Sequence, residues 1–139
     1  MPPRGLTRWT GAPRRVRVVA AATVLLLGYG TAVHVIQLVD AGFAPYPHLP
    51  GWLRSYFIGL TVLDPLAAVL LARARRSGVV LAVGVLVTDA AANAWANLVL
   101  DESPGLTSGR VGTAVIAALA VVLLVTARPL WRHAGGPGR

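Results

Sequence analysis

The chain contains no cysteine among its 139 residues, and this absence removes several kinds of chemistry. Disulfides, thiol nucleophiles, and zinc or iron–sulfur centres with cysteine ligands all require that residue. Acidic residues are also scarce, with five Asp and Glu against thirteen basic residues and a net charge of +8 at pH 7. The position of each carboxylate is therefore informative.

Lysine is missing as well, because all thirteen basic residues are arginine. The arginines stand next to apolar runs and do not form a basic face interleaved with aromatic residues, as a nucleic-acid-binding surface would. We therefore expect no nucleic acid partner. Anionic lipid headgroups are the nearer partner for these side chains.

Charged residues as a whole make up 13% of the chain and hydrophobic residues 55%. Soluble domains carry about 25% charged residues, so this composition indicates a membrane protein. A hydrocarbon core is crossed by runs of about 17–25 apolar residues. The sequence predicts an all-α, integral membrane four-helix bundle over residues 16–128, between a disordered basic arm (1–15) and a disordered tail (129–139), with helices at about 18–39, 52–72, 79–100 and 111–127.

The arginines predict the orientation of these helices, because short cytoplasmic loops carry an excess of positive residues. Two arginines, Arg54 and Arg110, fall on one side of the predicted membrane. The remaining eleven fall on the other side: Arg4, Arg8, Arg14, Arg15, Arg17, Arg73, Arg75, Arg76, Arg128, Arg132 and Arg139. We expect a multi-pass protein of the plasma membrane with both termini in the cytoplasm.

Two aspartates, Asp64 and Asp89, interrupt the second and third apolar runs near their middles. From the rise of a helix, both lie about 14–18 Å from the arginine-rich turn that joins the two runs. A charged side chain at this depth costs at least about 2.5–3.5 kcal/mol and usually faces a partner or a wet cavity. Two such carboxyls at one depth cannot both ionise cheaply, and we expect the pair to mark a functional site.

Further polar side chains are expected at a similar depth. Asn93 and Asn97 follow Asp89 at helical spacing, and His34 and Gln37 share a face of the first helix. We predict an outward-opening polar pocket flanked by Trp95. Its ligand-binding residues are His34, Gln37, Asp64, Asp89, Asn93 and Asn97.

Structural roles compete with this interpretation. Gln37 and Asn97 are typical of hydrogen bonds that only hold helices together, and His34 is compatible with a bond to a backbone carbonyl. Asp64 precedes Pro65 and could belong to a helix hinge. Asp89 could form a structural lock with an asparagine or a histidine.

The leading functional prediction is a module that binds or senses a lipid or a small amphiphile. Asp64 and Asp89 would be its counter-ions, with His34 and Asn93 as hydrogen-bonding partners. The alternatives are a lipid isomerase that uses an Asp as general acid and base, a proton-coupled transporter subunit, and a structural partner in a larger membrane complex. If the chain is a transporter subunit, we expect it to form a homo-oligomer, because four helices alone seldom enclose a transport path.

No catalytic residue and no cofactor is assigned. A histidine with two carboxylates is a ligand set for iron or zinc. However, these residues come from three helices without a local metal-binding spacing, so no metal is predicted.

The segments VHVIQLVDAG and PGWLRSYFIGLTVLDPL, within residues 25–75, resemble the EXPERA-domain proteins, the group that includes sterol isomerase (emopamil-binding protein). The resemblance implies four helices around an acid-lined cavity for a cationic or sterol-like ligand, with His34, Asp40 and Asp64 in that cavity. Leu60 stands where the relatives carry an acid, and Asp89 has no counterpart there. The chain also resembles the small, uncharacterised four-pass membrane proteins of high-GC actinobacteria.

Overall fold

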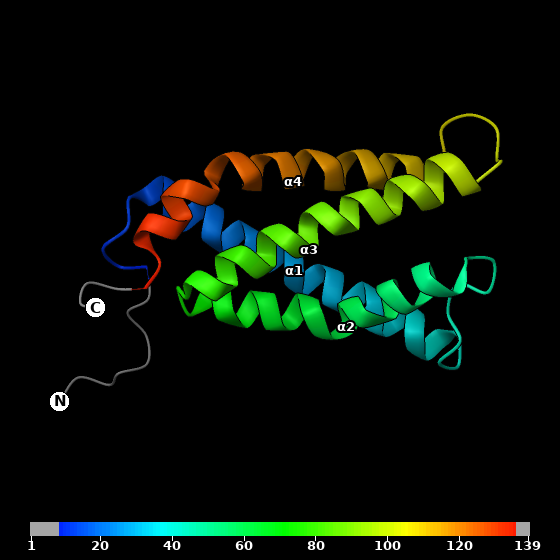
Figure 1. Ribbon diagram of the computed structural model, residues 1–139, viewed down its shortest axis with the longest axis horizontal. Helices are drawn as coiled ribbons and strands as arrows, with labels where there is room; N and C mark the ends of the chain where they lie inside the picture. Colours follow the sequence, from blue (N-terminus) through cyan, green and yellow to red (C-terminus); the bar gives the residue numbers. More distant parts are fainter. Residues whose placement is uncertain (1–8, 136–139) are drawn as a thin grey trace.

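The structure, a computed structural model, describes residues 9–135 (Figure 1). Residues 1–8 and 136–139 of the predicted arm and tail, with Arg4, Arg8 and Arg139, lie outside this range. The described chain is helical and contains no strand. Its elements are α1 (Arg14–Asp40), α2 (Gly51–Ala72), α3 (Arg76–Ala94), the π-helix η1 (Trp95–Leu100), which continues α3, and α4 (Ser108–His133).

The prediction of four long apolar helices is confirmed, since α1, α2, α3 with η1, and α4 are each long and apolar enough to cross a membrane. The helices extend beyond the predicted bounds. α4 runs from Ser108 to His133, so the first five residues of the predicted disordered tail are helical. The arm, predicted to be irregular through residue 15, is ordered from Trp9, whose Nε1 donates a hydrogen bond to the carbonyl of Leu71.

The helices pack in chain order, each against the next, whereas α1 and α4 make few contacts with each other. The two described ends of the chain and the α2–α3 turn lie at one end of the bundle, which we call the terminal end (Figure 1). The α1–α2 loop and the loop before α4 lie at the opposite end, which we call the loop end. α1 and α4 diverge towards the loop end (Figure 1).

The terminal end is held closely together. α3 crosses α2 at Gly78, where a side chain would collide with the backbone of Leu70 and Leu71. The α2–α3 turn has two hydrogen bonds of a Schellman motif, from Arg75 to Leu70 and from Ala74 to Leu71. The amide of Gly135, just beyond α4, donates to the carbonyl of Ala74 at 2.7 Å. These contacts hold the helices together at the terminal end, and α1 and α4 diverge from there towards the loop end (Figure 1).

The loop end is shaped by two local devices. α1 ends in a Schellman motif with Gly42 in the left-handed region at φ 58°, which turns the chain back across the bundle. In the first turn of α4, the guanidinium of Arg110 reaches back to the preceding segment. It donates to the carbonyls of Asn97 and Asp101, both at 3.1 Å, and to that of Gly105. Arg110 therefore satisfies carbonyls at the end of η1 that have no helical partner.

Candidate functional site

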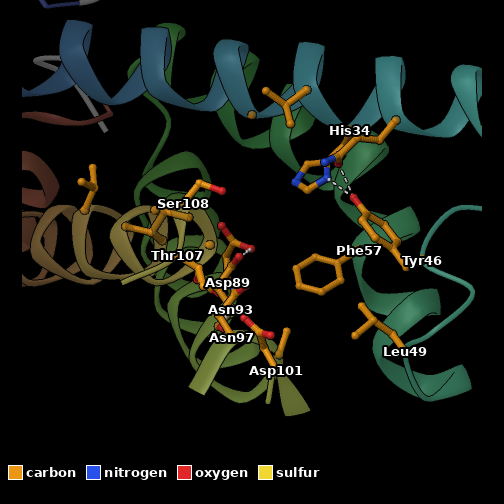
Figure 2. Close-up of a pocket in the computed structure, with 18 of the residues that line it drawn as sticks. His34, Tyr46, Leu49, Phe57, Asp89, Asn93, Asn97, Asp101, Thr107 and Ser108 are labelled. Carbon is orange, nitrogen blue, oxygen red and sulfur yellow. Dashed lines mark hydrogen bonds between the residues drawn. The ribbon is translucent and has the colours of Figure 1, made fainter. Parts of the chain in front are cut away.

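A cavity of about 1040 Å³ lies within the bundle towards the loop end (Figure 2). All four helices, η1 and both loops of that end contribute to its walls. The cavity brings together all six residues that the sequence analysis selected: His34, Gln37, Asp64, Asp89, Asn93 and Asn97.

Asp64 reaches the cavity from the middle of α2, and its side chain is only 5% exposed. The opposing surface is the backbone of Gly30 in α1, where an added Cβ would lie 2.6 Å from Oδ2 of Asp64. Within residues 9–135, no side chain or amide donates a hydrogen bond to this carboxylate and no cation pairs with it. Asp64 therefore presents an unpartnered carboxylate to the cavity.

Asp89 begins a polar stripe along α3 and η1. Nδ2 of Asn93 donates to Oδ1 of Asp89 at 2.8 Å and to its backbone oxygen at 3.0 Å. One turn on, Nδ2 of Asn97 donates to the carbonyl of Asn93 at 3.0 Å and to the hydroxyl of Thr113 at 3.2 Å. Asn93 thus orients the Asp89 carboxylate, and Asn97 joins the stripe to α4.

The π-helical turn at Trp95–Leu100 extends this stripe to the loop end. Side chains four apart drift steadily around the axis of an α-helix with 3.6 residues per turn. The i→i+5 bonding of η1 places more residues in each turn and offsets that drift. As a result Asp89, Asn93, Asn97 and Asp101 all line the cavity, one above the other in Figure 2.

An aromatic wall faces the stripe (Figure 2). The hydroxyl of Tyr46, from the α1–α2 loop, donates to Oε1 of Gln37 and lies 3.5 Å from Nδ1 of His34. The Phe57 ring of α2 packs against Tyr46 with centroids 5.3 Å apart and against His34 at 6.2 Å. Burial raises the pKa of Tyr46 above its ordinary value of 10.0, so the hydroxyl keeps the proton that it donates to Gln37.

The charge of the cavity is opposite to that of the chain. Four of the five acidic residues line it, namely Asp64, Asp89, Asp101 and Glu102. None of the arginines that the structure describes does so, and the only basic residues in its walls are His34 and His48. At the loop end, the hydroxyl and amide of Ser103 lower the pKa of Asp101, which keeps that carboxylate charged at neutral pH.

Two residues lie elsewhere than expected. Trp95, predicted to flank the pocket, is 48% exposed and does not line the cavity, because two residues after Asn93 it lies on the opposite face of the helix. Asp40, which the EXPERA resemblance places in the cavity, is the last residue of α1 and does not line it. The chain turns away at Gly42 directly after this residue.

The contribution of α4 was not predicted from the sequence. Gly109, Gly112 and Ile116 line the cavity, and an added side chain at Gly109 would collide with Asn97. The close spacing of two glycines in an apolar helix was the available signal, because small residues mark close helix approach. Tyr46 and Phe57 carried no comparable signal, since only the folded loop brings them together.

No family model, curated protein or solved structure matches this chain. Function must therefore be argued from the cavity. Within residues 9–135, no three His, Asp or Glu side chains come together so that they could hold a metal ion. The cavity offers carboxylate, amide and hydroxyl groups together with apolar side chains.

Proposed function

We propose that this chain is a multi-pass plasma-membrane protein that binds or senses an amphiphile with a cationic headgroup. Both termini would be cytoplasmic. Eight arginines that the structure describes lie at the terminal end, on α1, the α2–α3 turn and the last turns of α4, and no acidic residue lies there. This distribution supports the proposed orientation.

The observation that carries the proposal is the concentration of acidic residues in the cavity. A chain with a net charge of +8 places four of its five carboxylates around one space without an arginine among them. Carboxylates inside a membrane protein need a counter-charge or hydrogen-bond donors. Asp64 has neither among the described residues, so a cationic headgroup supplies what the cavity lacks.

The remaining walls fit the other part of such a ligand. Phe57, Leu86, Ile116 and Leu119 add apolar surface to the walls of the cavity. Mostly apolar walls with a few polar groups that set orientation are the arrangement expected for a small-molecule site. His34, Gln37 and Asn93 are placed to donate or accept the additional hydrogen bonds of the headgroup.

The experiment compares three ligands with the same hydrocarbon chain and different headgroup charge. Radiolabelled hexadecylamine, hexadecanol and hexadecanoate are added in trace amounts to the protein in phosphatidylcholine nanodiscs, with empty nanodiscs as the background. The amine should bind about 10-fold to 100-fold more tightly than the alcohol, as expected for one charge-assisted hydrogen bond. The carboxylate should bind most weakly, and equal binding of all three would contradict the proposal.

One observation favours a second candidate function. An unpartnered carboxylate on a cavity wall, as at Asp64, is also what a general acid and base in a lipid isomerase requires. Such an enzyme would exchange a carbon-bound hydrogen of an unsaturated lipid with solvent. Incubation with unsaturated lipids in deuterated water, followed by mass spectrometry, tests this candidate, since a binding module would incorporate no deuterium.

A further inference from the structure

The cavity lacks a complete wall between the first and the last helix. α1 and α4 both line it, yet they make few contacts with each other and diverge towards the loop end (Figure 1). The other three neighbouring pairs, α1 with α2, α2 with α3 and α3 with α4, pack closely. We call the gap between α1 and α4 the seam.

Residues at the edges of the seam are exposed although they line the cavity. Tyr29 of α1 is 70% exposed and Val115 of α4 is 53% exposed. A side chain can combine the two properties only where the cavity meets the outer surface. The other cavity residues on these two helices near the edges are apolar: Leu26, Val33, Ile116 and Leu119.

The seam lies beside the carboxylates. Gly30, next to Tyr29, touches the side chain of Asp64, and Thr113, two residues before Val115, accepts a hydrogen bond from Asn97. The polar end of the cavity and the apolar opening are therefore parts of one continuous space. α1 and α4 are long and apolar enough to cross a membrane, so in a bilayer the seam would face lipid chains and not water.

We propose that the seam is a lateral opening to the bilayer, and that it holds the hydrocarbon chain of the amphiphile while the headgroup lies at Asp64 and Asp89. This inference rests on the proposed function and narrows it. The ligand would be a long-chain amphiphile that arrives through the membrane, rather than a small amine that arrives from water. A hydrocarbon chain in the seam would stay among lipid tails and apolar side chains, so it need not leave an apolar environment while the headgroup reaches the carboxylates.

Two photoreactive hexadecylamines test the position of the ligand in the wild-type protein. One carries a diazirine next to the amine and the other carries it near the end of the chain. After illumination in nanodiscs, peptide mass spectrometry identifies the labelled residues. The headgroup probe should label α3 near Asp89, and the chain probe should label the seam at residues 26, 29, 115 or 119, both competed by unlabelled hexadecylamine.

The outcomes separate the two proposals. If the headgroup probe labels the cavity but the chain probe labels the loop end, at residues such as Leu49 or Ser103, the lateral opening is wrong and the proposed function stands. If unlabelled hexadecylamine competes with neither probe, both proposals are wrong.

A matched pair of glycine variants tests the seam independently. Gly112 lines the cavity and Gly28 does not, and a Cβ added at either position meets no atom within 4 Å. Gly112→Phe should narrow the space beside the seam and weaken hexadecylamine binding by roughly 5-fold or more, the factor expected when an added side chain overpacks an occupied site. Gly28→Phe should leave binding unchanged, and equal affinities of both variants would overturn the proposal.

Discussion

The contact between Gly30 and Asp64 gives a prediction that can be worked out from the structure. In Gly30→Ala, the added Cβ would stand 2.6 Å from Oδ2 of Asp64. An ordinary carbon–oxygen contact begins near about 3.3 Å, so the carboxylate or the helix must move by about 0.7 Å. Asp64 lines the cavity, so its side chain would have to rotate away from α1 into that space.

Two free energies oppose each other in this variant. Forcing a side chain about 30° off its preferred rotamer costs about 0.5–1.5 kcal/mol. Replacing glycine by alanine inside a helix returns about 0.8–1.0 kcal/mol. Gly28→Ala, two residues earlier in α1, supplies the control, because its Cβ meets no atom within 4 Å and only the favourable effect remains. Gly30→Ala should therefore be less stable than Gly28→Ala by about 0.5–1.5 kcal/mol.

The free energy of unfolding can be measured by titrating mixed micelles with denaturing detergent. A double-mutant cycle with Asp64→Ala assigns the difference to the carboxylate, since without Oδ2 the two alanine variants should be equally stable. Equal stabilisation by Gly28→Ala and Gly30→Ala in the wild-type background would refute the placement of Asp64 against α1.

Four further predictions follow from other contacts. Fusion reporters at positions 45, 75 and 105 should report outside, inside and outside, and an outside signal at 75 would overturn the topology. Asn97→Ala should lower the free energy of unfolding by about 0.6–1.7 kcal/mol, because it removes the hydrogen bond to Thr113; unchanged stability would show that this bond contributes nothing. Gly78→Ala should be more destabilising still, since its Cβ would meet backbone that cannot rotate away, and a tolerated alanine would contradict the close crossing of α2 and α3. Burial raises the pKa of Tyr46, so its contacts should stabilise the fold below pH 10 and be lost as the pH rises further, a pH dependence of unfolding that Tyr46→Phe should weaken.

The helices could be predicted from the sequence because long apolar runs are a strong signal. Their ends could not, because Arg14 and the residues after Ala127 are helical although their polarity ends the apolar pattern. Tertiary contacts fix such ends. Examples are the hydrogen bonds from the side chain of Trp9 to the carbonyl of Leu71 and from the amide of Gly135 to the carbonyl of Ala74.

The cavity was predictable where regular spacing carried the information. Asp89, Asn93 and Asn97 follow at four-residue steps, and all three line the cavity as predicted. Trp95 was misplaced although its spacing of two residues from Asn93 already puts it on the opposite face of a helix. The aromatic wall of Tyr46 and Phe57 depends on how the loop returns across the bundle, which local patterns do not encode.

The selectivity for a cationic headgroup is the central claim, and removing the carboxylate charge tests it most directly. The measurement is the ratio of hexadecylamine affinity to hexadecanol affinity in wild type, Asp64→Asn, Asp89→Asn and Asp40→Asn. Asp40→Asn is the matched control, because this acid does not line the cavity. The ratio should be about 10 or more in wild type, fall in the variants of Asp64 and Asp89, and be kept in Asp40→Asn. A ratio that is the same in all four proteins would contradict the central claim.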